Sequence, residues 1–280
     1  LSYPVARKMA FQDYTKNPDL CNILDTPNNI LGIEYLKALR HINSSIKPFT
    51  LSRKGAGYHA EQLHETFSSA SAIRASLLQA DVQHNSWKSE GSLKQMPPAA
   101  AQIMRNNYNR KTPVYSNDFS LLLKAKLLTE TCDSLIEYAD ISEALARRII
   151  NQRNQFVNWD AFCELLKTKD MTYSRISRAL MHILLNIRTE DMTAYQAEQN
   201  CCYARVLGFR KEQTEILKLF KQNSSVPVIT KLGQIDSLSN AGQKMSDTDC
   251  YASNLYESVV TDKFHTPFIE EHSKSLVLYE

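Results

Sequence analysis

The sequence predicts a mainly α protein, in which a small α/β segment at the start of the chain is followed by an all-α domain. The 280 residues include only seven glycines and nine prolines, while Leu, Ala, Lys, Arg, Glu and Gln, which favour helices, are frequent. Beyond residue 98, most segments space their apolar residues three and four positions apart, as one buried helix face requires. A single short segment, "KPFTLSR", is the strand candidate.

The first 80 residues contain three predicted helices. One runs around Val5 to Thr15, and a second runs from Asn29 to His41 with its apolar side chains at helical spacing. The third opens in "SSASAIRASLLQA", where Ser69 or Ser71 is the expected N-cap. Because the strand candidate lies between the second and third helices, residues 1–80 are interpreted as one α/β unit.

A polar segment at residues 81–98, "DVQHNSWKSEGSLKQMPP", is the predicted linker, since it ends on two prolines and contains a glycine. Residues 99–280 are predicted to form the helical domain. Its expected helix starts are Asp118, Asp140, Asp160 and Thr172. The Thr172 helix, "TYSRISRALMHILLNI", has the clearest core stripe of the chain.

Composition excludes several classes of protein. No apolar stretch approaches the 18 residues of a membrane span. The six cysteines form no C-x-x-C pair and have no histidines at zinc-finger spacing, so we predict no metal site and reduced thiols in a cytoplasmic protein. A net charge of +3 is too small by itself to indicate nucleic-acid binding.

Two basic segments of the first 80 residues suit phosphate binding. In "SRKGAGYH", Arg53 and Lys54 precede two glycines, which allow the backbone a close approach. In "SASAIR", hydroxyl groups and free N–H groups meet at a helix N-terminus, with Arg74 one turn inside. Neither segment is a Walker loop or a Rossmann glycine pattern. The alternative is a strand, a turn and an ordinary Ser-capped helix, with Arg53 and Lys54 solvated.

Two further segments could contact RNA. Between residues 141 and 188, eight Lys/Arg stand against four Asp/Glu, and Arg175, Arg178 and His182 share one helix edge. The alternative is a solvated polar face beside a packed stripe. In "CCYARVLGF", Arg205 beside an aromatic residue could stack on an unpaired base, or pack against the tyrosine. Gly208 is expected to end a helix there.

Several segments together resemble one bacterial family. "PNNILGIEYLKAL", "SSIKPFTLSRKGAGYH" and "SASAIRASL", followed by "TYSRISRALMHILLNI", "YARVLGF" and "SSVPVITKL", are similar in order and spacing to the tRNA(Met) cytidine acetate ligases. The resemblance implies a remnant of an α/β nucleotidyltransferase (Rossmann-like) domain, followed by an all-α tRNA-binding domain.

The resemblance also implies the chemistry. Such enzymes use ATP, with Mg²⁺, to activate acetate as acetyl-adenylate, and then acetylate the wobble cytidine of elongator tRNA(Met). The ATP contacts it implies are Asn28, Arg53, Lys54 and Arg74. On this interpretation Arg175, Arg178 and Arg205 contact the tRNA.

One feature of the family has no counterpart. None of the seven histidines forms an H-x-G-H signature, so no catalytic residue is assigned. We expect the chain to hold one wall of an ATP pocket and to be an incomplete enzyme, inactive on its own. The alternatives are a non-catalytic helical RNA-binding module and a plain helical interaction protein.

Overall fold

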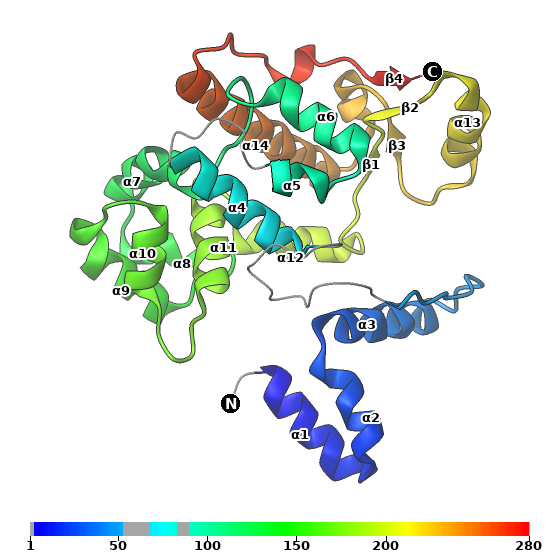
Figure 1. Cartoon of the computed structure of the whole chain (residues 1–280), viewed down its shortest axis with the longest axis horizontal. Helices are drawn as coiled ribbons and strands as arrows, with labels where there is room; N and C mark the ends of the chain where they lie inside the picture. Colours follow the sequence, from blue (N-terminus) through cyan, green and yellow to red (C-terminus); the bar gives the residue numbers. More distant parts are fainter. Residues whose placement is uncertain (1–2, 53–67, 83–89, 280) are drawn as a thin grey trace. The chain divides into compact units, whose positions relative to one another are not determined.

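The computed structural model describes residues 3–52, 68–82 and 90–279, which fall into two compact units, Leu1–Asn106 and Asn107–Glu280. This division lies beyond the predicted linker at 81–98. The described part of that linker contains a short helix and the start of another (Figure 1). Pro98 begins the second of these helices, as suits a residue without a backbone N–H group.

All regular elements among the described residues of the first unit are helical. Its elements are α1 (Tyr3–Thr15), α2 (Pro18–Asn22), the 3₁₀ turn η1 (Ile23–Asp25), α3 (Pro27–His41), α4 (Ala70–Val82), α5 (Glu90–Lys94) and α6 (Pro98–Asn107). α3 starts at a proline after Thr26, whose hydroxyl accepts a hydrogen bond from the Asn29 N–H at 3.4 Å. α4 starts after Ser69, whose hydroxyl accepts from the Ala72 N–H at 3.0 Å. The predicted serine cap of the third helix is therefore confirmed at Ser69.

The strand predicted in "KPFTLSR" is wrong for the part that the structure describes. Residues 47–52 have no regular secondary structure, and no strand occurs among the described residues of this unit. A strand is stable only when another strand completes its hydrogen bonds, and its own sequence cannot supply that partner.

The second unit contains the remaining elements. They are η2 (Ser116–Phe119), α7 (Ser120–Thr129), α8 (Cys132–Ile136), α9 (Glu143–Gln152), η3 (Arg153–Gln155), α10 (Trp159–Leu166), α11 (Tyr173–Leu184), α12 (Thr189–Ala197), β1 (Ala204–Arg205), β2 (Gly208–Arg210), η4 (Lys211–Gln213), α13 (Thr214–Asn223), β3 (Val228–Ile229), η5 (Leu232–Ser237), α14 (Asn240–Phe264), η6 (Glu271–Ser273) and β4 (Val277–Tyr279). Within the described ranges, no helix is both long and apolar enough to cross a membrane. The prediction of a mainly helical chain is confirmed.

The main core of this unit lies among α7 to α11. Trp159, Phe162, Ile176, Leu180 and Ile183 are all fully buried there. The apolar stripe predicted in "TYSRISRALMHILLNI" is the buried face of α11, as its three- and four-residue spacing requires. The indole Nε1 of Trp159 donates a hydrogen bond to the Ser177 hydroxyl at 3.1 Å, so α10 and α11 are joined by a polar contact inside the core.

Helix starts were only partly predicted. Thr172 caps α11, since its hydroxyl accepts from the Arg175 N–H at 3.4 Å. Asp140 is not the cap of α9, because Ser142 takes that place and the φ of Asp140 is +64°. Asn158 rather than Asp160 caps α10. In both corrected cases a neighbouring Ser or Asn, also a good cap residue, occupies the capping position instead.

The second unit is not all-α. β1 pairs with β3 and β2 pairs with β4, each in parallel. Gly208 begins β2 and does not end a helix as predicted. A Cβ built there would lie 2.7 Å from the Val277 carbonyl oxygen, so glycine permits the close pairing of β2 with β4.

Candidate functional site

The predicted nucleotide contacts lie in the first unit. Asn28 is an exposed residue in the first turn of α3. Arg74 is exposed on α4, and its guanidinium donates to the Ser71 hydroxyl at 3.4 Å. No hydrogen bond or ion pair joins these two side chains among the described residues. Arg53 and Lys54 lie outside the described residues, so the nucleotide site stays a prediction.

The predicted RNA contacts on α11 differ in their surroundings. Arg175 is exposed, and its side chain has no ion pair within the described part of the chain. The Nε of Arg178 donates to the Asp140 carboxylate at 2.7 Å. The Nδ1 of His182 lies 3.0 Å from the Ala139 carbonyl oxygen, and the side chain is largely buried. His182 is therefore held inside the unit by the backbone, whereas Arg175 is the more available cation.

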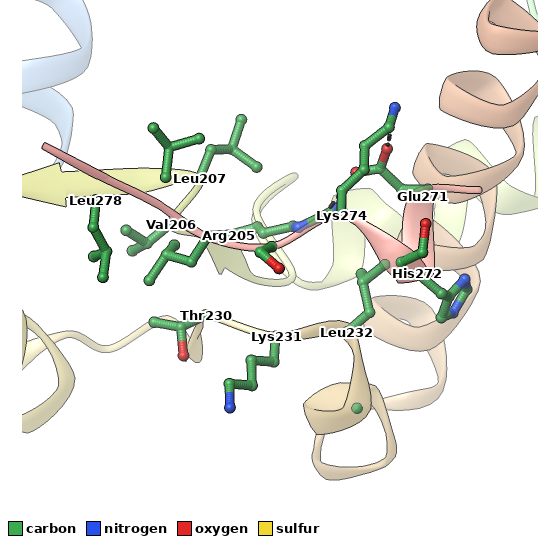
Figure 2. A pocket seen from close by; sticks show the side chains of 15 residues that line it. Arg205, Val206, Leu207, Thr230, Lys231, Leu232, Glu271, His272, Lys274 and Leu278 are labelled. Carbon is green, nitrogen blue, oxygen red and sulfur yellow. Dashed lines mark ion pairs between the residues drawn. The ribbon is translucent and has the colours of Figure 1, made fainter. Parts of the chain in front are cut away.

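Arg205 belongs to a buried ionic cluster in another part of the same unit. Its guanidinium lies 2.8 Å from the Glu271 carboxylate, and the two side chains are 18% and 9% exposed. Lys274 lies 3.0 Å from the same carboxylate (Figure 2). The partner of Arg205 is thus an acid brought in from η6, and not the adjacent tyrosine. An RNA contact by Arg205 stays a prediction.

The environment of Glu271 favours its charged form. Burial tends to raise the pKa of this carboxyl. Hydrogen bonds from Ser253, Lys274 and Arg205, together with the charge of Lys274, outweigh burial and hold the pKa below its ordinary value. Glu271 is therefore a charged anchor that fixes Arg205 and Lys274 in place.

These residues border a pocket of about 760 Å³. Its walls come from the segment between β1 and β2, the segment from β3 to η5, and the segment from η6 to β4 (Figure 2). Leu207, Leu232 and Leu278 supply apolar wall, while Lys231 and His272 add polar groups. The volume lies in the range of small-molecule sites in proteins.

The sequence did not predict this pocket, because its walls are joined only by tertiary contacts. The local signal that did exist is a run of positive charge. Residues 204–232 contain six Lys/Arg against two Asp/Glu, a local excess of +4. No group of three or more His, Cys, Asp or Glu side chains suited to a metal ion occurs in the described ranges.

Comparison with known proteins identifies the family. The model of the HIGH nucleotidyl transferase family matches residues 1–270. A tRNA(Met) cytidine acetate ligase of Alkaliphilus metalliredigens is 32% identical over 98% of this chain, and one of Thermoanaerobacter sp. is 36% identical over 91%. The chain belongs to the HIGH nucleotidyl transferase family, and it is similar to tRNA(Met) cytidine acetate ligases along nearly its whole length.

Solved structures agree with this similarity to tRNA(Met) cytidine acetate ligases at the level of the fold. Apo TmcAL of Thermotoga maritima matches 99% of this chain with a TM-score of 0.87 at 24% identity. TmcAL of the same organism bound with alpha-thio ATP matches with a TM-score of 0.84 at 23% identity. The sequence matches confirm the resemblance to the tRNA(Met) cytidine acetate ligases, and the solved structures support the fold.

The chain is shorter than these tRNA(Met) cytidine acetate ligases. It spans 66% of the Alkaliphilus protein and 61% of the Thermoanaerobacter protein. It covers 67% and 66% of the two TmcAL chains.

Proposed function

We propose that the chain acts in the ATP-dependent acetylation of the wobble cytidine of elongator tRNA(Met), in the cytoplasm, with acetate as the acetyl donor. The observation that carries this proposal is the match to tRNA(Met) cytidine acetate ligases over 91% to 98% of the chain. The alpha-thio ATP bound by the Thermotoga TmcAL supports ATP as the nucleotide. In the proposed arrangement the first unit contacts ATP and the second contacts tRNA.

The residues proposed for the nucleotide are suited to an adenylation step. Acetate oxygen attacks the α-phosphorus, pyrophosphate leaves, and negative charge grows on the phosphate oxygens. Arg53, Lys54 and Arg74 would balance that charge, while Asn28 in the first turn of α3 would donate a hydrogen bond near a favourable helix end. Mg²⁺ would be held mainly through phosphate oxygens, since the described residues gather no carboxylate cluster for it.

ATP is expected to protect the chain against thermal unfolding, because a ligand that binds only the folded state stabilises it. Asn28→Ala and Arg74→Ala should reduce the ATP-induced rise of Tm, measured by differential scanning fluorimetry. The matched controls are Asn22→Ala and Arg40→Ala, at exposed positions of α2 and α3. Equal protection of wild type and both site variants would remove these residues from the nucleotide site. If ATP did not raise the Tm of the wild-type chain while the chain still bound tRNA, the alternative of a non-catalytic RNA-binding module would be favoured.

For tRNA, the exposed edge of α11 is the proposed contact. Arg175→Ala should weaken binding of elongator tRNA(Met) and reduce the salt slope of the affinity by about 1, because one phosphate contact is lost. Arg178→Ala should act in the same direction, since an exposed pair with Asp140 is worth only about 1 kcal/mol or less and can be exchanged for a phosphate.

The matched control for both variants is Lys124→Ala on α7, another exposed cation without an ion pair in the described part of the second unit. Filter binding or fluorescence anisotropy measures the affinities. If the Arg175→Ala, Arg178→Ala double variant bound tRNA as tightly as the Lys124→Ala control, α11 would not be the tRNA contact.

A further inference from the structure

The pocket between the two small sheets has the properties of a site for one unpaired nucleotide. Its volume of about 760 Å³ lies within the range that holds a molecule of this size. Leu207, Leu232 and Leu278 supply an apolar surface against which a base can lie. The flat face of a base is largely apolar, so its burial against these leucine side chains removes apolar surface from water.

Cations border the same pocket. Arg205 and Lys274 are held in fixed positions by the Glu271 carboxylate, to which they lie at 2.8 Å and 3.0 Å. A guanidinium has five N–H donors, so its contact with Glu271 leaves others for a ligand. Lys231 borders the pocket from the opposite wall, is exposed, and has no ion pair within the described ranges.

Exposed positive charge follows the pocket-lining residues 205–207 along the chain. Arg210, Lys218 and Lys221 follow in β2 and α13, all exposed and without ion pairs among the described residues. An apolar pocket bordered by cations, in a positively charged segment of the chain, fits a polyanion with flat bases better than an apolar peptide, because a peptide would leave this charge unmatched.

We propose that this pocket binds a single unpaired nucleotide of the tRNA, with its base against Leu207, Leu232 and Leu278 and its phosphate at Lys231. The proposal rests on the proposed function, in which the second unit contacts tRNA. It adds a second RNA contact, separate from the edge of α11, and gives it a chemical class: an unstacked nucleotide rather than duplex backbone alone.

The test fills the pocket without disturbing the fold. Gly233 lines the pocket, and a Cβ built on it meets no atom within 4 Å, so Gly233→Leu places a side chain there at little steric cost. We expect Gly233→Leu to weaken the binding of elongator tRNA(Met) about tenfold, because the base loses its contact with the apolar wall. Lys231→Ala should reduce the salt slope by about 1. Lys124→Ala is the charge control, and the Tm of each variant reports on folding.

A second measurement uses nucleotides alone. Cytidine 5′-monophosphate and adenosine 5′-monophosphate should shift the leucine methyl NMR signals of the pocket in the wild-type chain, and not in Gly233→Leu. Inorganic phosphate should shift them less, because it has no base to contact the apolar wall.

The outcomes separate the two proposals. If wild type binds tRNA, and Gly233→Leu and Lys231→Ala bind it equally well with unchanged Tm, the pocket proposal is overturned while the proposed function stands. If wild type fails to bind tRNA, the proposed function fails, and the pocket proposal fails with it. Nucleotide-induced shifts that persist in Gly233→Leu would also contradict the pocket assignment.

Discussion

Trp159→Ala is expected to lower the free energy of unfolding of the second unit by about 3–5 kcal/mol, the cost of removing a large aromatic side chain from a packed core. Trp159 is fully buried among α7 to α11, and it donates a hydrogen bond to Ser177. The substitution therefore opens a cavity and also leaves the Ser177 hydroxyl without this partner. Chemical denaturation followed by circular dichroism measures the change.

Leu121→Ala is the matched control, because Leu121 lies on α7 of the same unit with 77% of its surface exposed. Its effect should stay within about 0.5 kcal/mol. A loss for Trp159→Ala no larger than that of Leu121→Ala would show that the core does not lie where the structure places it.

Arg205→Ala is expected to destabilise the second unit by about 3 kcal/mol, because it removes the partner of a buried carboxylate. Of the two cations that contact Glu271, only Lys274 would remain. The control is Arg178→Ala, whose ion pair is 60% exposed on the arginine side and should cost about 1 kcal/mol or less. Urea unfolding at neutral pH measures both.

The pH dependence of this effect follows from Glu271. Its pKa is lower in the folded chain than the ordinary value of 4.5, so the charged carboxylate stabilises the fold above that value, and this contribution is lost as pH falls through the lowered pKa. The difference between wild type and Arg205→Ala should therefore shrink on acidification. Adding Glu271→Gln to Arg205→Ala should recover part of the loss at neutral pH. A pH-independent difference, with no recovery in the double variant, would contradict the buried pair.

Because Arg205→Ala is expected to destabilise the second unit, it is a poor probe of RNA binding. A loss of tRNA affinity in Arg205→Ala can follow from local unfolding as well as from a lost contact. Gly233→Leu and Lys231→Ala avoid this ambiguity, because neither residue takes part in the Glu271 ion pairs.

Periodic features were predicted well from the sequence. The stripe of α11 and its Thr172 cap depend on residues within a few positions of one another, and both are present as expected. Strands were not predicted correctly, because β1 pairs with β3 and β2 pairs with β4 across intervening helices. Gly208 illustrates the difference: its role depends on the Val277 carbonyl oxygen, which the local sequence does not reveal.

In the candidate site too, local features could be predicted from the sequence and tertiary contacts could not. Arg175 could be identified from local charge, and the structure leaves it exposed. Arg205 was singled out by its aromatic neighbour, yet its partner Glu271 comes from the other end of the unit. Burial and tertiary pairing could not be predicted from charge patterns alone.

The most direct test is the salt dependence of the affinity of the wild-type chain for elongator tRNA(Met). If Arg175, Arg178 and Lys231 each neutralise one phosphate, the slope of log K against log salt is about −2.7. The affinity should then fall roughly 40-fold between about 50 mM and 200 mM salt. Undetectable binding at the lower salt concentration, or an affinity that does not change with salt, would contradict the proposed function.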